Sequence, residues 1–219
     1  MFNLASQELG HLKSQELKLF KSPEIALFKS LNTPRKIQHF LNHIPANFEP
    51  DGDTCLSPRM VLKENRAHCI EGAMLAALIL RIHGHQPLLV DLEATRDDFD
   101  HVIAVFKQHG HWGAISKTNH AVLRYRDPIY KTIRELVMSY FHEYFDKNGK
   151  KTLRKYTEPI DLSLFDYREW MSTEEELWYI ADHLAKAKHI SLLNRKQIAL
   201  LKKPDTIEME FGEVVEWKK

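Results

Sequence analysis

The longest nearly uninterrupted hydrophobic stretch of the chain begins at Cys69. Residues 69–82 are apolar on nearly every side of a helical projection, and Gly84 follows shortly after them. A helix that is hydrophobic all round is buried, and glycine commonly terminates helices. The pattern therefore predicts a fully buried helix that carries Cys69 in its first turn.

Apolar β-branched residues on the C-terminal side of this helix predict a β-hairpin. His101 opens the run 101–106, a turn follows near Gly110, and residues 112–116 form a returning apolar segment. If the turn is centred there, facing residues have numbers that add up to about 219. His101 is therefore expected to lie opposite the polar residues of the segment 116–119.

Weaker patterns predict the elements around this pair. Serine or threonine before proline indicates a helix start, helical spacing of apolar residues indicates a helix, and alternation indicates a strand. These signals predict helices starting at Ser22, Thr33, Ser57 and Thr173, a strand over 87–92, a turn over 125–130 leading into an aromatic helix, and a final edge strand around Ile207, Met209 and Phe211.

The elements together predict an α+β fold in which the buried helix packs on a small antiparallel sheet. A chain of 219 residues, 43% hydrophobic and 28% charged, is long enough for one globular domain with appendages. We divide it into an N-terminal helical extension (1–32), a core (33–120), and a mostly helical C-terminal elaboration of the same domain (121–219). The last part is expected to cover the cleft.

Cys69 is the candidate nucleophile. The free N–H groups and the positive dipole end of a first helical turn favour thiolate over thiol, and the thiolate is the form that attacks carbon. His101 is the candidate general base, because a cysteine at a helix start and a histidine at a strand start form a Cys-His pair when the helix packs on the sheet. The alternative is that Cys69 is a small buried hydrophobe, as free cysteines often are. Cys55 is expected to have only such a packing role.

A third residue is needed to hold the histidine ring in the correct tautomer. The hairpin register offers Ser116 and Asn119 for this task, and the sequence does not choose between them. A serine can fix the ring by hydrogen bonding but brings no negative charge, whereas asparagine would give a Cys-His-Asn arrangement. Both residues could equally be ordinary turn residues at a strand end.

Several local features follow one another in a characteristic order along residues 33–120. They are Ser57-Pro58 at a short helix, Cys69 at the start of the buried helix, Leu80-Arg81-Ile82-His83-Gly84 before a strand, His101 at the next strand, 32 residues after the cysteine, and Trp112 followed by Ile115. In this order they resemble the core of the transglutaminase-like cysteine enzymes, which have a papain-like fold. The resemblance implies Cys69 as nucleophile and His101 as general base.

The chain departs from that family's pattern at two places. The family usually has an aspartate shortly after the tryptophan, where this chain has Ser116. It also usually has Gly-x-Cys at the nucleophile, where this chain has Ala67-His68-Cys69. Neither change removes the nucleophile or the base.

Composition excludes several other classes of function. The net charge is +1 and acidic and basic residues are interspersed, so no basic patch indicates a nucleic-acid or membrane partner. Two cysteines without a CxxC motif suit a reducing compartment, and no secretory leader or apolar span is evident, so we expect a cytoplasmic location. The 13 histidines have no ligand spacing that completes a metal site, and no cofactor is expected.

The expected activity is hydrolysis of an amide or peptide bond by the Cys-His pair, on a peptide, protein or small amide. Two alternatives remain open. One is transfer of the acyl group to an amine, as in transglutaminases, which depends on how well the cleft excludes water. The other is a catalytically inactive module that binds a peptide or protein, which the serine at position 116 favours. The sequence does not indicate an oligomeric state.

Overall fold

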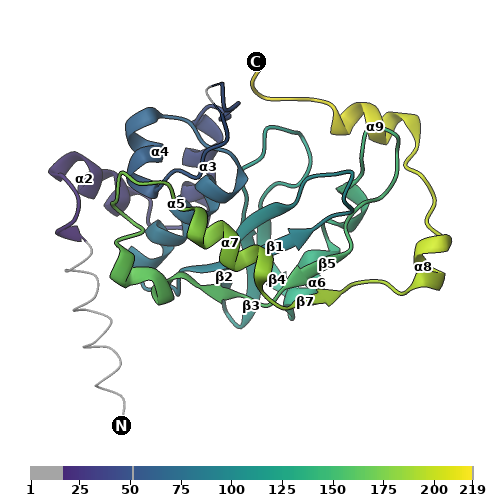
Figure 1. Cartoon of the computed structure of the whole chain (residues 1–219). Helices are drawn as coiled ribbons and strands as arrows, with labels where there is room; N and C mark the ends of the chain where they lie inside the picture. Colours follow the sequence, from purple (N-terminus) through teal and green to yellow (C-terminus); the bar gives the residue numbers. More distant parts are fainter. Residues whose placement is uncertain (1–16, 51, 219) are drawn as a thin grey trace, which may run out of the picture.

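An antiparallel sheet organises the computed structural model, which describes residues 17–50 and 52–218 (Figure 1). Its strands in the described residues follow the order β4-β3-β2-β1-β5-β7, and β6 pairs with β1 beside β5. The strands are β1 (Leu88–Glu93), β2 (His101–Gln108), β3 (His111–Ile115), β4 (Arg126–Tyr130), β5 (Lys155–Thr157), β6 (Ile160–Asp161) and β7 (His189–Ser191). The fold is therefore α+β, as the sequence predicts.

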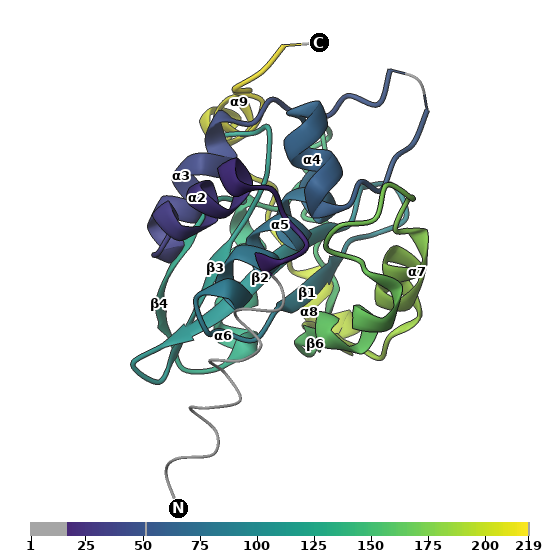
Figure 2. The ribbon, with the colours of Figure 1, turned by 90° about the vertical axis from the view of Figure 1, so that its left-hand side faces the viewer.

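The buried helix is α5 (Cys69–Ile82), and it packs on β2. Figure 2 shows it between the sheet and the helices α2 (Ser22–Ser30), α3 (Pro34–His43) and α4 (Pro58–Glu64). Being enclosed in this way, it buries residues on every side, and the residues from Ala73 to Leu80 are at most 1% exposed. The predicted buried helix is confirmed.

The other face of the sheet has its own hydrophobic cluster. Val90, Ile103 and Val105 of the sheet pack with Leu136 and Tyr140. They are covered by α6 (Ile133–Met138) and the short 3-10 helix η1 (Phe141–Glu143). The remaining helices of the described residues are η2 (Leu162–Arg168), α7 (Trp178–Lys186), α8 (Arg195–Ala199) and α9 (Thr206–Gly212), and the buried residues of η2 and α7 join the cluster around α5. Among the described residues, no helix is long and apolar enough to cross a membrane.

The predicted hairpin register is confirmed. Ala104 pairs with Ile115 and Gln108 with His111, so the numbers of facing residues add up to 219 in both pairs. His109 and Gly110 both have positive φ values, 48° and 82°. A two-residue turn that links antiparallel strands commonly requires this backbone conformation. Because the turn fixes the register, His101 and residue 116 come to the same end of the hairpin.

The helix-start predictions differ in accuracy. Thr33 and Ser57 cap α3 and α4 as predicted, with side chains that accept hydrogen bonds from Lys36 N and Met60 N. Ser22 is instead the first residue of α2. The helix start predicted at Thr173 is too early by five residues, because α7 begins only at Trp178. Residues 1–16 of the N-terminal extension lie outside the described residues.

Two predictions in the C-terminal part are wrong. The alternating residues 207–211 lie in a helix, α9, because Glu208 accepts a hydrogen bond from Asp205 N, 2.7 Å away, and closes a capping box. Residues 126–130 form the edge strand β4 rather than a turn, and Pro128 is tolerated because an edge strand needs hydrogen bonds on one side only. The elaboration 121–219 thus adds four strands to the sheet as well as helices.

Candidate active site

Cys69 is the first residue of α5 and is partly exposed. The chain before it is held by backbone hydrogen bonds of 3.1 Å from Ala67 N to Pro45 O and from Asn47 N to Ala67 O. The first N–H groups of a helix have no partner within the helix. The Cys69 N–H is therefore a donor available to a negatively charged oxygen that forms next to the sulfur.

His101, the first residue of β2, is held by the hydroxyl of Ser116. His101 Nε2 lies 2.8 Å from Ser116 Oγ, and Ser116 Oγ lies 2.5 Å from Leu123 O. A carbonyl oxygen only accepts, so the serine gives its single hydrogen to Leu123 and must accept from His101. In the neutral ring His101 therefore carries its hydrogen on Nε2, and Nδ1 is the nitrogen that can take up the proton of the thiol.

Ser116 is itself fixed by a side chain that the sequence interpretation missed. Gln38 of α3 accepts a hydrogen bond from Ser116 N, at 2.9 Å, and donates one to Ser116 O, at 2.8 Å. The pair spans 78 positions of the chain and is buried. The end of β3 is thus locked to α3, and the hydroxyl that orients His101 has little freedom to move.

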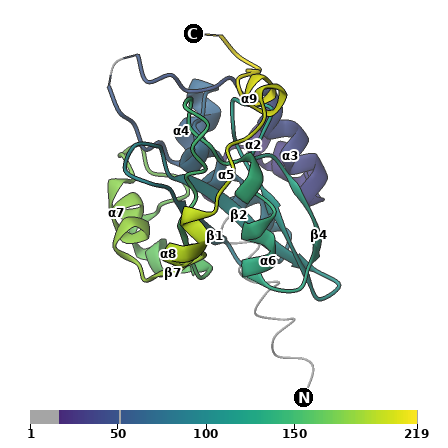
Figure 3. The ribbon, with the colours of Figure 1, turned by 90° about the vertical axis from the view of Figure 1, so that its right-hand side faces the viewer.

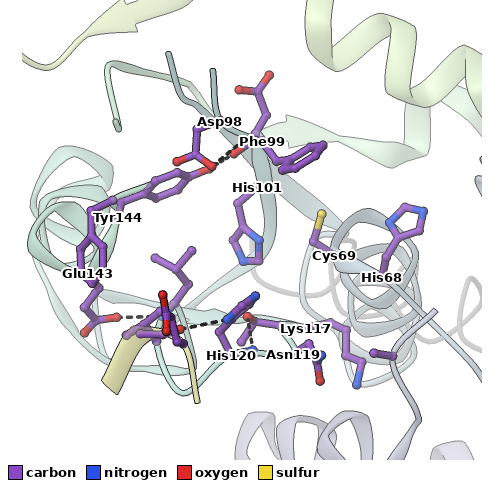
Figure 4. A pocket seen from close by; sticks show the side chains of 18 of the residues that line it. His68, Cys69, Asp98, Phe99, His101, Lys117, Asn119, His120, Glu143 and Tyr144 are labelled. Atoms are coloured by element: carbon purple, nitrogen blue, oxygen red, sulfur yellow. Dashed lines mark hydrogen bonds between the residues drawn. The ribbon is translucent and has the colours of Figure 1, made fainter. Parts of the chain in front are cut away.

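The surroundings of Cys69 favour its thiolate (Figure 4). Burial on its own would raise the pKa of the thiol, but hydrogen bonds from His101 and His68 and the charge of the two rings lower the pKa to about 5. The two imidazoles lie on different sides of the sulfur, His101 from the sheet and His68 from the residue before the helix. At neutral pH Cys69 is therefore a thiolate.

His68 and Glu71 are further site residues that the sequence interpretation missed. His68 Nε2 lies 2.9 Å from Thr54 O and 3.3 Å from Glu71 Oε1. Glu71 is fully buried and is the single charged residue between Cys69 and Leu80. A lone carboxylate in an otherwise apolar helix, three residues after a histidine, is the signal that could have identified this pair.

Asn119, the other predicted orienting residue, has a different partner in the structure. Its side chain donates to Trp217 O, at 3.0 Å, and accepts from Trp217 N, at 2.8 Å. Asn119 therefore anchors the C-terminal segment. Of the two candidates, Ser116 is the residue that hydrogen-bonds His101.

Lys117 also faces the site but serves the scaffold. Its Nζ donates to Leu41 O, at 3.2 Å, and to Ile44 O, at the C-terminal end of α3. A cation is favourable at this end of a helix. Burial nevertheless lowers the pKa of Lys117 to about 8.

Cys69, His68 and His101 line a cavity of about 490 Å³. The loop before β2 forms one wall and is tied down by side chains: Asp98 accepts from Thr152 Oγ1, at 2.5 Å, and Asp100 accepts from Ala94 N, at 2.7 Å. Residues of α9 and of the segment 117–123 form the opposite wall. The cavity is large enough for a peptide side chain or a small amide beside the sulfur.

The other cysteine lies outside this cavity. Cys55 is fully buried, and burial followed by the nearby charges of Glu71 and Glu176 raises its pKa to about 12. Its thiol is therefore protonated and inaccessible, as a packing residue should be. Among residues 17–50 and 52–218, no group of three or more His, Cys, Asp or Glu side chains is arranged to hold a metal ion.

Neither a protein-family model nor a curated protein sequence matches this chain.

Proposed function

We propose that this protein catalyses thiol-dependent acyl transfer, with hydrolysis of an amide or peptide bond as the reaction. One observation carries the proposal: the Cys69 sulfur lies at the start of a helix, on the wall of a cavity that His101 also lines, and its surroundings lower its pKa to about 5. Structural cysteines have no need of a lowered pKa, and strongly shifted groups in cavities are typical of catalytic sites.

The residues present account for each step of such a reaction. The Cys69 thiolate attacks the carbonyl carbon, and the resulting oxyanion lies near the Cys69 N–H. The C–N bond then breaks, the protonated His101 gives its proton to the leaving nitrogen, and a thioester remains on Cys69. His101 next takes a proton from water, the water oxygen attacks the thioester carbon, and the C–S bond breaks to restore the thiolate.

The resemblance to transglutaminase-like enzymes belongs to the same proposal. It is supported by the placement of the cysteine helix α5 against the strand β2, with His101 and Ser116 at one end of the β2–β3 hairpin. A papain-like core would have this juxtaposition. We also propose a reducing, cytoplasmic location, because both cysteines are free and the thiolate must stay reduced to act.

Two other activities fit the same site. An amine in place of water would give transglutaminase-type transfer, since both attack the same thioester. A binding module without catalysis is favoured by Ser116, because a hydroxyl supplies no negative charge to stabilise a protonated His101.

Iodoacetamide labelling of Cys69 against pH tests the proposal, with Cys55→Ser in every sample and His101→Ala as the comparison. An activated thiolate reacts well below the unperturbed cysteine pKa of about 8.5. A labelling midpoint near 8.5 in the parent protein would contradict the enzyme interpretation and leave the binding module. If the midpoint is low, fluorogenic amides with and without a primary amine then separate hydrolysis from transfer.

A further inference from the structure

We propose that His68 is a second catalytic imidazole, which holds the Cys69 thiolate by its positive charge from the side opposite His101. The inference deepens the proposed function, because it assumes that Cys69 is the nucleophile. It concerns a residue that has no role in a site made only of Cys69, His101 and the residue that orients His101.

The Nε2 atom of the His68 ring is surrounded by hydrogen-bond acceptors. Its Nε2 lies 2.9 Å from Thr54 O, 3.3 Å from Glu71 Oε1 and 3.5 Å from Glu49 Oε1. None of these oxygens can donate a hydrogen when both carboxyl groups are ionised, so Nε2 must carry one. The ring also lies beside Cys69, on the side away from His101 (Figure 4).

Glu71 supplies the buried negative charge that keeps His68 protonated. Its two oxygens accept hydrogen bonds from four further groups: Thr54 Oγ1 at 2.8 Å, Leu56 N at 2.9 Å, His68 N at 2.9 Å and Asn47 Nδ2 at 3.1 Å. Because all four groups donate hydrogen bonds to the two Glu71 oxygens, the buried side chain is a carboxylate. A buried carboxylate needs a nearby cation. Within the described residues, the ring of His68 is the cation within ion-pair distance of Glu71.

The protonated ring therefore lies between two anions, Glu71 and the Cys69 thiolate. Burial would lower the pKa of His68, but the hydrogen bond to Cys69 and the charges of Glu71 and Cys69 raise it to about 9. The titratable groups that face this pair from the surrounding elements are Glu49 before α4, Cys55 in the same segment, His101 of β2, Asp91 of β1 and Tyr144 after η1.

This arrangement explains how the site can work with a serine at position 116. In a two-residue pair, the thiolate persists only while the histidine keeps the proton. With His68 as a fixed counter-charge, the thiolate does not depend on the protonation of His101. His101 can then pass protons to and from the substrate, and a neutral hydroxyl suffices to orient it. Glu71 supplies to His68 the negative charge that an aspartate at position 116 would supply to His101.

The test compares the pH midpoint of iodoacetamide labelling at Cys69 in a set of Cys55→Ser proteins. His68→Asn keeps a good helix N-cap while it removes the charge. Glu71→Gln is a second, independent variant, because it keeps the shape of Glu71 but leaves His68 without its buried carboxylate. His109→Asn is the matched control: it lies at the hairpin turn with a positive φ that asparagine tolerates.

We expect His68→Asn to raise the midpoint by about one to two pH units, which lowers the labelling rate at pH 6 by about twofold to tenfold. Glu71→Gln should shift it in the same direction, His109→Asn should leave it unchanged, and His68→Asn combined with His101→Ala should return it to that of a free thiol. Thermal unfolding of each variant verifies that it is folded at the labelling temperature.

The two proposals fail in different ways. If the parent protein has a low midpoint and neither His68→Asn nor Glu71→Gln moves it, the role of His68 is refuted and the Cys69-His101 pair stands. If the parent protein titrates like a free thiol, the proposed function itself is refuted.

Discussion

A single hydroxyl sets the orientation of His101. Ser116 Oγ accepts from His101 Nε2 and donates to Leu123 O, so it cannot reverse its role without losing a hydrogen bond. The ring is 7% exposed and the serine is 1% exposed, so water does not easily replace the lost partner. The tautomer of His101 is therefore a consequence of one buried side chain.

Ser116→Ala should free the His101 ring. Loss of a buried hydrogen bond of about 1 kcal/mol is expected to reduce turnover of an amide substrate by about fivefold to tenfold. In nitrogen NMR spectra, the neutral ring should change from the single Nε2-H tautomer to a mixture. Ser116→Thr keeps the hydroxyl and is the control; an unchanged tautomer in Ser116→Ala would show that another group orients the ring.

The two cysteines should differ sharply in reactivity. The pKa of Cys69 is lowered to about 5, so its thiolate forms as the pH rises through 5 and its labelling rate should be flat from about pH 6 to pH 8. The pKa of Cys55 is raised to about 12, so it should stay unlabelled over this range. Peptide mass spectrometry after brief labelling verifies this, with urea-unfolded protein as the sample in which both cysteines react.

At the scale of elements, the site depends on how closely α5 approaches the end of β3. Gly72 lies one turn after the helix start, and a Cβ built on it would be 2.4 Å from Cβ of Lys117. That distance is shorter than van der Waals contact allows. The glycine therefore permits the approach, even though glycine is a poor helix former.

Gly72→Ala should destabilise the fold despite its better helix propensity. Overpacking costs about 1–3 kcal/mol, and the gain in propensity is at most about 1 kcal/mol. Because Lys117 follows Ser116 directly, the displaced backbone should also disturb the orientation of His101. Urea unfolding measures the stability; a variant more stable than the parent would show that Lys117 moves aside without cost.

At the scale of the whole molecule, the C-terminal segment closes one side of the cavity. It runs along the outside from α8 to α9 (Figure 3) and contributes Met209, Gly212 and Glu213 to the cavity wall. Helix α9 has no buried residue. The segment is held largely by polar contacts, among them Asn119 with Trp217 and an ion pair of 3.1 Å between Arg124 and Glu216.

Asn119→Ala should loosen this cover without changing the nucleophile. It removes both hydrogen bonds to the Trp217 backbone, so labelling of Cys69 by a bulky maleimide should rise relative to labelling by iodoacetamide. The pH midpoint of labelling should stay the same. A shifted midpoint with an unchanged ratio of rates would instead support Asn119 as a residue that orients His101.

The sequence by itself determined the features that depend on neighbours along the chain. The all-round apolar run specified α5, threonine or serine before proline specified the starts of α3 and α4, and the turn at His109-Gly110 specified the hairpin register. Each of these signals acts within a few residues through hydrogen bonding, backbone conformation or periodicity. They were sufficient to place Cys69 at a helix start and His101 near Ser116.

The tertiary structure decided which polar groups meet. Gln38 reaches Ser116 across 78 positions and Thr54 reaches Glu71 across 17, and no local pattern encodes either contact. An edge position in the sheet allowed β4 to include a proline. His68, Cys69 and Glu71 are neighbours in the sequence, but the burial of Glu71 and the contact of His68 with Thr54 O arise only in the folded chain.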